Sequence, residues 1–383
     1  MLPSPALQNI PTPAYVADIA AIKRNMEIAA HIKAETGCKI LLATKAFAMP
    51  AVFPYMQGAL DGTTASGLYE ARLGAKHFGK EVHTYSPAYR EEDLLATLEY
   101  SDHIYFNAAA QLKRFAPLVR AKKPQAKIGL RVNPQLSLVK NSALYDPSSQ
   151  TSRFGVLASE LTDEALKQID ILHFHNLCEN MAEESARLIT HISEKFETAL
   201  RRMSRVNLGG GHYITHPDYK TDILIKALKD FQARFDLSVT LEPGGALVYN
   251  AGYLIGEVID IIQRPGQNLA ILDASASTHM PDVLEVPYRP NIIGSAEDGE
   301  KPHTYLLGGN TCMTGDIIGT YSFDTPLEIG QKLAFTDMMQ YSFVKNTTFN
   351  GVPLPDLGIL HEDGRYEVIK RFGYDDFAAR LGA

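Results

Sequence analysis

Eight short apolar runs that alternate with helical stretches constrain the fold of this chain more than any other feature. This alternation, sustained over about 200–250 residues, is typical of a (β/α)8 barrel, the TIM-type class of α/β fold. A first helix over residues 19–36 precedes the runs, with Asp18 as its N-cap and Gly37 as its stop. Later helices are predicted over residues 91–99, 108–120, 182–202 and 222–235. The predicted strands are residues 39–44, 60–65, 81–85, 103–106, 127–132, 169–174, 205–208 and 238–241.

The rhythm changes after Gly245, where long helices no longer separate the predicted strands. We therefore expect the barrel over residues 18–245 and a β-rich domain, a sandwich or a barrel, over residues 246–383. The N-terminal segment 1–17 is expected to join this second domain. A polar loop over residues 134–154 has the length of a functional or mobile segment. The predicted strands of the second domain are residues 253–263, 268–273, 303–307 and 332–336.

Composition excludes several classes of protein. The formal net charge of −7 argues against a nucleic-acid binder and weakly favours cationic ligands. No apolar run reaches the length of about 18 residues that a membrane span needs, and no signal peptide is evident. Three cysteines, Cys38, Cys178 and Cys312, are too few for a disulfide framework. They indicate a reducing cytoplasm.

Polar and glycine-rich residues follow directly after several of the predicted barrel strands. Parallel strands of a barrel all end on the same face, which is where barrel enzymes keep their active sites. These residues are therefore expected to meet on one rim, and the expectation does not depend on any single motif. They are Lys45 after the first strand, Ser66 and Gly67 after the second, His175 after the sixth, Gly209, Gly210 and Gly211 after the seventh, and Glu242 after the eighth.

Three of these features point to one cofactor chemistry. Burial at the rim would lower the pKa of Lys45 and make its amine a nucleophile for a carbonyl group, although an exposed lysine at a strand end is the simpler alternative. Glycines 209–211 could close their backbone N–H groups on a phosphate, or could form a plain turn. Glu242 could hold a proton on a pyridine nitrogen, or could be a solvated loop acid. Together they indicate pyridoxal phosphate (PLP).

Two further candidates are weaker when each is taken alone. His173 and His175 alternate along one predicted strand, and His175, nearer the rim, could stack on a flat ring. A core histidine is the simpler interpretation of His173, and a metal pair with His175 lacks an evident third ligand. Cys312 lies in a glycine-framed polar loop and could donate a proton, although a lone cysteine is more often structural.

The whole pattern resembles the alanine-racemase-like (fold type III) PLP enzymes, and within them the ornithine and diaminopimelate decarboxylases. The resemblance extends from about residue 12 to residue 372. It is carried by LATK at 42–45, FH at 174–175, GGG at 209–211, EPG at 242–244, TC at 311–312, Tyr341, and TFNG at 348–351.

One branch, carboxynorspermidine/carboxyspermidine decarboxylase, is more similar still. Its motifs here are TTASGLYE at 63–70, HTYS at 83–86, SRFG at 152–155, NLCE at 176–179, HMPD at 279–282, NTCMTGD at 310–316 and VKNTTFNG at 344–351. The resemblance implies decarboxylation of carboxynorspermidine or carboxyspermidine to norspermidine or spermidine, by a homodimer with two shared sites. It implies that Lys45 holds PLP, that His175 stacks on it, that Glu242 meets its pyridine nitrogen, and that glycines 209–211 with Tyr341 bind its phosphate.

Substrate contacts follow partly from the resemblance and partly from charge. The resemblance implies that Cys312 comes from the partner subunit and that Asp282 meets the amine chain of the substrate. A cationic polyamine tail also favours spaced acids, which Asp316 and Glu179 could supply.

Gly245 departs from the resemblance, because the branch usually has a glutamate here that holds the substrate. Ornithine-type relatives have an arginine, so this chain matches neither. We therefore expect a weakened hold on the polyamine tail. Three alternatives stay open: a decarboxylase of another basic amino acid (diaminopimelate, ornithine, lysine or arginine), a racemase, which Glu242 disfavours, and a catalytically weak PLP-binding homologue.

Overall fold

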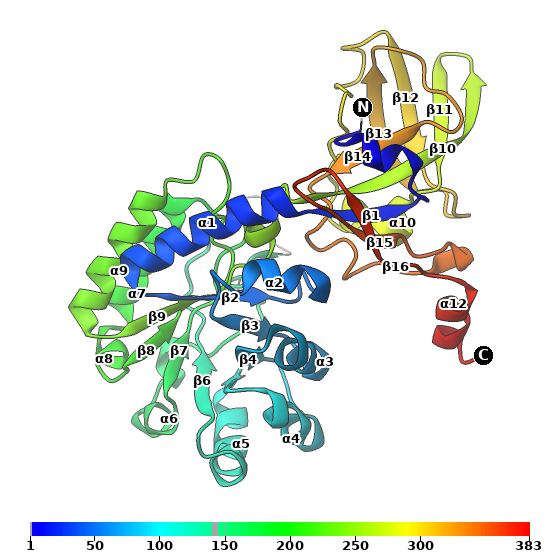
Figure 1. The fold of residues 1–383 in the computed structure, drawn as a ribbon. Helices are drawn as coiled ribbons and strands as arrows, with labels where there is room; N and C mark the ends of the chain where they lie inside the picture. Colours follow the sequence, from blue (N-terminus) through cyan, green and yellow to red (C-terminus); the bar gives the residue numbers. More distant parts are fainter. Residues whose placement is uncertain (1, 140–144, 150) are drawn as a thin grey trace. The chain divides into compact units, whose positions relative to one another are not determined.

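The structure is a computed structural model that describes residues 2–139, 145–149 and 151–383 (Figure 1). Part of the predicted polar loop over residues 134–154 therefore lies outside the described residues. The chain divides into two compact units. A sheet unit comprises Met1–Lys23 and Val248–Ala383, and a barrel unit comprises Arg24–Leu247.

The barrel unit is a closed barrel of parallel strands in sequential order, with helices around its outside (Figure 1). This confirms the predicted (β/α)8 fold class. Its strands are β2 (Lys39–Ala43), β3 (Gly62–Ala65), β4 (Glu81–Tyr85), β5 (His103–Phe106), β6 (Lys127–Arg131), β7 (Ile171–His173), β8 (Arg205–Asn207) and β9 (Ser238–Leu241). The helices of this part of the chain are α1 (Ile19–Thr36), α2 (Phe53–Met56), α3 (Leu68–Leu73), α4 (Glu91–Tyr100), α5 (Ala109–Lys122), α6 (Asp163–Gln168), α7 (Ala182–Lys195), α8 (Glu197–Leu200) and α9 (Thr221–Phe235).

Local signals explain where the first helix begins and ends. The Asp18 carboxylate accepts a hydrogen bond from the Ala21 N–H at 3.1 Å, and Gly37 adopts the left-handed φ of +67° that ends the helix. The single helix expected over residues 182–202 is wrong, because it breaks at Phe196 into α7 and α8. Phe196 is buried and packs on Phe174 with ring centroids 5.2 Å apart, so tertiary packing interrupts the helix there.

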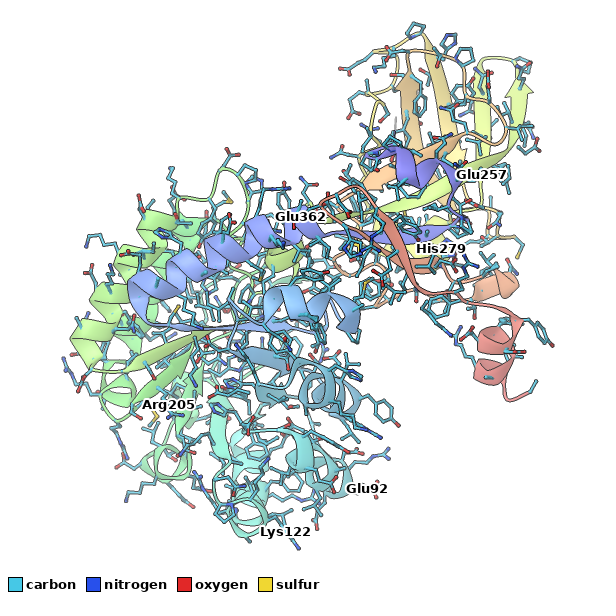
Figure 2. All side chains as sticks on the ribbon, in the orientation of Figure 1. Glu92, Lys122, Arg205, Glu257, His279 and Glu362 are labelled. Atoms are coloured by element: carbon cyan, nitrogen blue, oxygen red, sulfur yellow. The ribbon has the colours of Figure 1, made fainter. Side chains whose placement is uncertain are left out.

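The predicted site residues of the barrel unit follow the C-terminal ends of its strands, not the N-terminal ends. Lys122, at the end of α5, and Arg205, at the start of β8, lie toward the N-terminal end of the strands (Figure 2). The C-terminal ends are followed by the residues that the sequence analysis singled out. The barrel therefore gathers the predicted site residues of its own unit on one face.

The sheet unit is built around one long strand, β10, which pairs with β1, β11 and β14. A bulge between Val258 and Asp260 interrupts its pairing with β11. The described strands follow the order β13-β12-β11-β10-β1-β15-β16, with β14 off this path on β10. They are β1 (Ala14–Asp18), β10 (Gly252–Arg264), β11 (Gln267–Leu272), β12 (His303–Gly308), β13 (Ile317–Phe323), β14 (Lys332–Thr336), β15 (Asp356–Leu360) and β16 (Tyr366–Lys370). Short helices α10 (Ala276–His279), α11 (Asp282–Glu285) and α12 (Tyr374–Leu381) complete the unit.

The core of the sheet unit includes the buried side chains of Tyr15, Leu254, Tyr321 and Phe335. Tyr15 comes from the N-terminal segment and the others from the C-terminal part, so both chain ends build one core. Within the described part of the chain, no helix combines the length and the apolar character needed to cross a membrane.

Candidate active site

The barrel rim brings together the residues predicted there. Lys45 lies two residues beyond β2, His175 two residues beyond β7, and Glu242 directly after β9. The charges of Arg131 and Glu242 act on the Lys45 amine, and the charge of Lys45 acts on His175. These residues therefore share one environment, as the alternating pattern of strands and helices predicted.

Lys45 has the environment of a reactive amine. Burial and the positive charge of Arg131 lower its pKa, while the negative charge of Glu242 opposes them. No hydrogen bond or ion pair joins its Nζ to any other residue that the structure describes. A larger fraction of this amine is consequently neutral at a given pH, which favours attack on a carbonyl carbon.

Glu242 is a buried acid held by polar neighbours, with 3% of its surface exposed. Its Oε1 accepts a hydrogen bond from Asn207 Nδ2 at 2.7 Å. Burial alone would raise its pKa, but His173 and His83 outweigh burial and hold the pKa well below the usual value. His173 Nε2 lies 3.5 Å from Oε2 and His83 Nδ1 lies 3.7 Å from Oε1. The acid is therefore a carboxylate, and the simpler interpretation as a solvated loop acid is wrong.

The glycine segment packs too closely for any side chain. A Cβ on Gly209 would lie 2.7 Å from the His175 Cα, and one on Gly210 would lie 2.5 Å from the Glu242 carbonyl oxygen. A Cβ on Gly211 would lie 2.0 Å from the Leu177 carbonyl oxygen. These glycines therefore let the backbone after β8 approach His175 and Glu242.

The backbone N–H groups of glycines 209–211 were expected to meet a phosphate, and at least one of them already has an acceptor. The Gly209 N–H donates to Asn207 Oδ1 at 2.8 Å, so its donor is already engaged. The Gly210 N–H points at His175 Nδ1 at 3.4 Å, a long contact that a stronger acceptor could replace. Burial and the charges of Lys45 and Arg131 hold the pKa of His175 well below its usual value, so this ring is neutral.

Sequence reasoning missed the polar side chains that point into the barrel. Arg131 donates to the His175 carbonyl oxygen at 2.9 Å and stacks on Tyr85 and Phe154, 4.7 and 4.4 Å from their ring centroids. It lies at the end of β6, and His83 lies within β4. A charged or titratable residue inside an otherwise apolar barrel strand is the signal that could have identified both.

Other predicted residues belong to the sheet unit. Cys312 is exposed, and its N–H donates to Asn350 Oδ1 at 2.7 Å. Tyr341 has a left-handed φ of 55° in a turn of the same unit. Asp282 forms an ion pair with Lys345, so a cation already occupies the acid that was expected to meet the substrate.

Asp316, another expected substrate contact, is held by its neighbours within the sheet unit. It is only 3% exposed, and both its oxygens accept hydrogen bonds from the Ser275 hydroxyl, at 2.9 and 2.8 Å. The Ser277 N–H and the Thr311 hydroxyl donate to it as well, at 3.1 and 2.6 Å. Its acceptor sites are therefore occupied within the unit, and it orders the loop that carries Cys312.

The remaining two predicted substrate contacts belong to the barrel unit. Glu179 is exposed, with a left-handed φ of 51°, in the loop after β7. Gly245 begins a short 3-10 helix, Gly245–Val248, directly after the EPG segment. Both lie beyond C-terminal ends of barrel strands, on the same face as Lys45.

Two groups of side chains have donor atoms close enough to consider a metal ion. One joins His173 and His175 to Glu242, which supplies the third ligand that the sequence did not show, and the other joins Glu81, His83 and His103. In the second group the His83 and His103 rings stack with centroids 3.8 Å apart at 16°, so their in-plane lone pairs do not converge on one ion. In the first group Asn207 and the Gly210 N–H engage Glu242 and His175. We assign a metal to neither.

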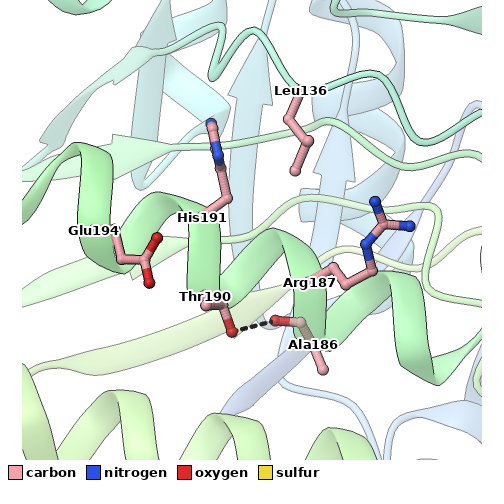
Figure 3. A pocket seen from close by; sticks show the side chains of 6 residues that line it. All are labelled: Leu136, Ala186, Arg187, Thr190, His191 and Glu194. Atoms are coloured by element: carbon pink, nitrogen blue, oxygen red, sulfur yellow. Dashed lines mark hydrogen bonds between the residues drawn. The ribbon is translucent and has the colours of Figure 1, made fainter.

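A surface hollow of about 360 Å³ lies against α7 (Figure 3). The Thr190 hydroxyl on its wall donates to the Ala186 carbonyl oxygen at 3.0 Å. None of the predicted site residues lines it. The residues that line it are Leu136, Ala186, Arg187, Thr190, His191 and Glu194.

Comparison with known proteins identifies the family. The family model described as pyridoxal-dependent decarboxylase, C-terminal sheet domain, matches residues 14–339. This match places the chain among the enzymes that use PLP. The chain belongs to the pyridoxal-dependent decarboxylase family, which confirms the expected cofactor and carboxy-lyase chemistry.

Individual relatives match over almost the whole chain. Carboxyaminopropylagmatine decarboxylase from Synechocystis sp. is 39% identical and covers 100% of this chain and 98% of its own length. Carboxynorspermidine/carboxyspermidine decarboxylase from Campylobacter jejuni is 38% identical, over 97% of this chain and 99% of its own. The crystal structure of carboxynorspermidine decarboxylase from C. jejuni, complexed with norspermidine, has a TM-score of 0.90 at 36% identity and covers 97% and 100% of the two chains.

Proposed function

We propose that this protein decarboxylates carboxynorspermidine and carboxyspermidine to norspermidine and spermidine in polyamine biosynthesis. The observation that carries the proposal is the similarity to enzymes of that name at 36–38% identity, over 97% of this chain. The TM-score of 0.90 to the norspermidine complex supports it, because the fold and chain length are shared throughout. Relatives from the diaminopimelate group are only 22–26% identical.

The barrel rim fits PLP. Lys45 offers an amine with a lowered pKa, and Glu242 offers a buried carboxylate for the pyridine nitrogen. The Gly210 N–H and the neutral ring of His175 lie beside them, suited to the phosphate and to the ring face. Gly211 and Tyr341 complete the proposed cofactor contacts, while Gly209, whose N–H is engaged by Asn207, lets the backbone approach His175. When bound, PLP supplies an electron sink for the bond that breaks at the substrate α-carbon.

Each side chain has a defined task in this proposal. Lys45 Nζ would hold the cofactor covalently, and Glu242 would keep a proton on its pyridine nitrogen. Arg131 fixes the backbone at His175 through its carbonyl oxygen. Cys312 Sγ donates a proton to the α-carbon after CO₂ leaves, and its exposure within its own unit suits a thiol that serves the partner subunit of a homodimer.

Specificity depends on groups that meet the amines of the tail. Asp282 is paired with Lys345. In this proposal an ammonium group of the substrate takes the place of the Lys345 ammonium beside the Asp282 carboxylate. Glu179, exposed at the rim, is the second candidate acid. Gly245 contributes no side chain, so we expect a raised KM more than a changed reaction. The net charge of −7 favours this cationic substrate over nucleic acid, and the few cysteines favour the cytoplasm.

A panel of amino acids tests the proposal by measuring CO₂ release. We expect the highest kcat/KM with carboxynorspermidine or carboxyspermidine, and a loss of turnover in Lys45→Ala. Matched assays use ornithine, lysine, arginine and diaminopimelate at equal concentrations. Faster turnover of any of these four would contradict the substrate assignment.

A second candidate substrate is carboxyaminopropylagmatine. The Synechocystis enzyme of that name is 39% identical over this entire chain, as close a match as the carboxynorspermidine enzymes. Its tail would end in a planar guanidinium, which prefers a bidentate carboxylate, whereas an amine needs only a point contact. Adding this compound to the panel decides between them, because a higher kcat/KM for it would replace our first assignment.

A further inference from the structure

A row of polar side chains runs through the barrel below Glu242. Glu81 and His83 lie two residues apart on β4, so both point to the same side of the strand. His83 Nδ1 lies 3.7 Å from Glu242 Oε1, and His83 Nε2 lies 3.5 Å from Glu81 Oε2. Both separations are ion-pair distances. A single imidazole, only 1% exposed, therefore faces one carboxylate with each ring nitrogen.

Hydrogen bonds join the same groups by a second route. Tyr105 Oη lies 3.1 Å from His83 Nδ1. Asn207 Nδ2 donates both to Tyr105 Oη at 3.0 Å and to Glu242 Oε1 at 2.7 Å. Because Asn207 and Tyr105 are buried, this route is shielded from water and fixes the orientation of the Glu242 carboxylate.

Charge balance singles out His83 among the histidines near Glu242. A buried carboxylate needs a cation or donors close by. Burial lowers the pKa of His173, and it lowers that of His103 to about 2, so both rings hold a positive charge less readily than His83 does. Burial also acts to lower the pKa of His83, but Glu242 and Glu81 outweigh it and the pKa is raised. The titratable and charged groups around His83 are Glu81, Lys39, His103, Tyr105, His173 and Glu242.

Glu81 shows the reciprocal effect at the other end of the row. His83 is the largest cause of a pKa lowered to about 2, against burial and together with Lys39. Glu81 lies at the start of β4 and keeps about a third of its side chain exposed, at 34%. The row thus connects the rim acid with a partly exposed acid at the opposite end of the barrel strands.

We propose that His83 is a positioning residue that, as an imidazolium, keeps Glu242 ionised and oriented toward the pyridine nitrogen of PLP, and that Glu81 holds the proton on His83. The inference deepens the proposed function, since it rests on the role given there to Glu242. On this inference His83, which lies outside the rim, helps to set the pH above which kcat falls.

The test changes Glu81→Gln in the full-length holoenzyme, with Glu35→Gln as the matched control. Glu35 also forms an ion pair with a lysine, Lys229 at 2.7 Å, but lies outside the row. Because an opposite charge at this range moves a pKa by roughly 1–3 units, the His83 midpoint should fall by about that much in Glu81→Gln. Histidine-selective NMR measures it, and His83→Asn identifies the resonance. Glu35→Gln should titrate like the unchanged protein.

Two further measurements distinguish a His83 that positions Glu242 from a His83 that only stabilises the fold. The pH at which the bound cofactor changes its absorption, and the alkaline limb of kcat, should move down with the His83 midpoint in Glu81→Gln. Glu81→Asp, which keeps the charge, should restore both. An unchanged His83 midpoint in Glu81→Gln would overturn the inference. The NMR titration needs no substrate, so it stands even if no compound in the panel is decarboxylated.

Discussion

Lys39 and Lys45 lie at opposite ends of the same strand, and this position gives their identical side chains different environments. Lys39 begins β2, and its ammonium forms an ion pair with Glu81, while Lys45 lies beyond the end of the strand with a lowered pKa. The sequence could predict this difference, because the barrel pattern already assigns the two ends of each strand to opposite faces.

We expect PLP to be covalently bound to Lys45. Borohydride reduction followed by digestion and mass spectrometry should place a pyridoxyl group on the peptide that contains Lys45, and leave Lys39 unmodified. The physical reason is the larger neutral fraction of the Lys45 amine. A label on another lysine, or a label that persists in Lys45→Ala, would remove Lys45 from this role.

The acids of the sheet unit show what the sequence could not predict. Asp316 looked like an available loop acid, but its partner Ser275 lies 41 residues away in the chain. Asp282 is likewise occupied by Lys345, 63 residues away. Whether a carboxylate is engaged or available depends on such long-range contacts, and these follow from tertiary packing rather than from local pattern.

At the scale of elements, the strands of the barrel unit were easier to predict from the sequence than those of the sheet unit. The barrel strands were predictable because each is a local apolar run that precedes a helix. In the sheet unit, β13 was missed because Gly319 interrupts its apolar run, and β16 was missed because charged residues alternate along it. Polar residues inside the barrel strands, such as His83 and Arg131, were missed because an apolar run was interpreted as uniformly apolar.

The loop over residues 309–316 should depend on Asp316 for its order. Asp316→Ala leaves the Ser275 and Thr311 hydroxyls without their acceptor, and hydrogen bonds to a buried charge contribute about 1.5–3 kcal/mol each. We expect a loss of about 2–4 kcal/mol in unfolding free energy, measured by urea denaturation.

Asp324→Ala is the matched control for this change. Asp324 follows β13 and pairs with Lys301 at 2.7 Å, but its side chain is 74% exposed. We expect its removal to change the unfolding free energy by less than about 1 kcal/mol. Equal effects of the two substitutions would show that Asp316 does not order the loop.

At the scale of the whole molecule, the proposed catalytic residues are divided between two units. Lys45, His175 and Glu242 belong to the barrel unit, whereas Cys312 and Tyr341 belong to the sheet unit. The loop with Cys312 is exposed and carries apolar neighbours, Met313 at 45% and Ile317 at 37% exposure. Apolar side chains beside a proposed catalytic thiol are what a subunit contact would cover.

We therefore expect a two-fold homodimer in which each subunit supplies Cys312 to the site of the other. Lys45→Ala and Cys312→Ala subunits should each be inactive alone. When they are mixed and exchange at random, half of the dimers pair one of each kind. Such a dimer has one site that carries both changes and one site that carries neither. Activity should therefore return to about a quarter of that of the unchanged protein, measured as CO₂ release. Native mass spectrometry of subunits with distinguishable masses shows whether exchange has occurred. Exchange without any recovery of activity would mean that each site is built from a single chain.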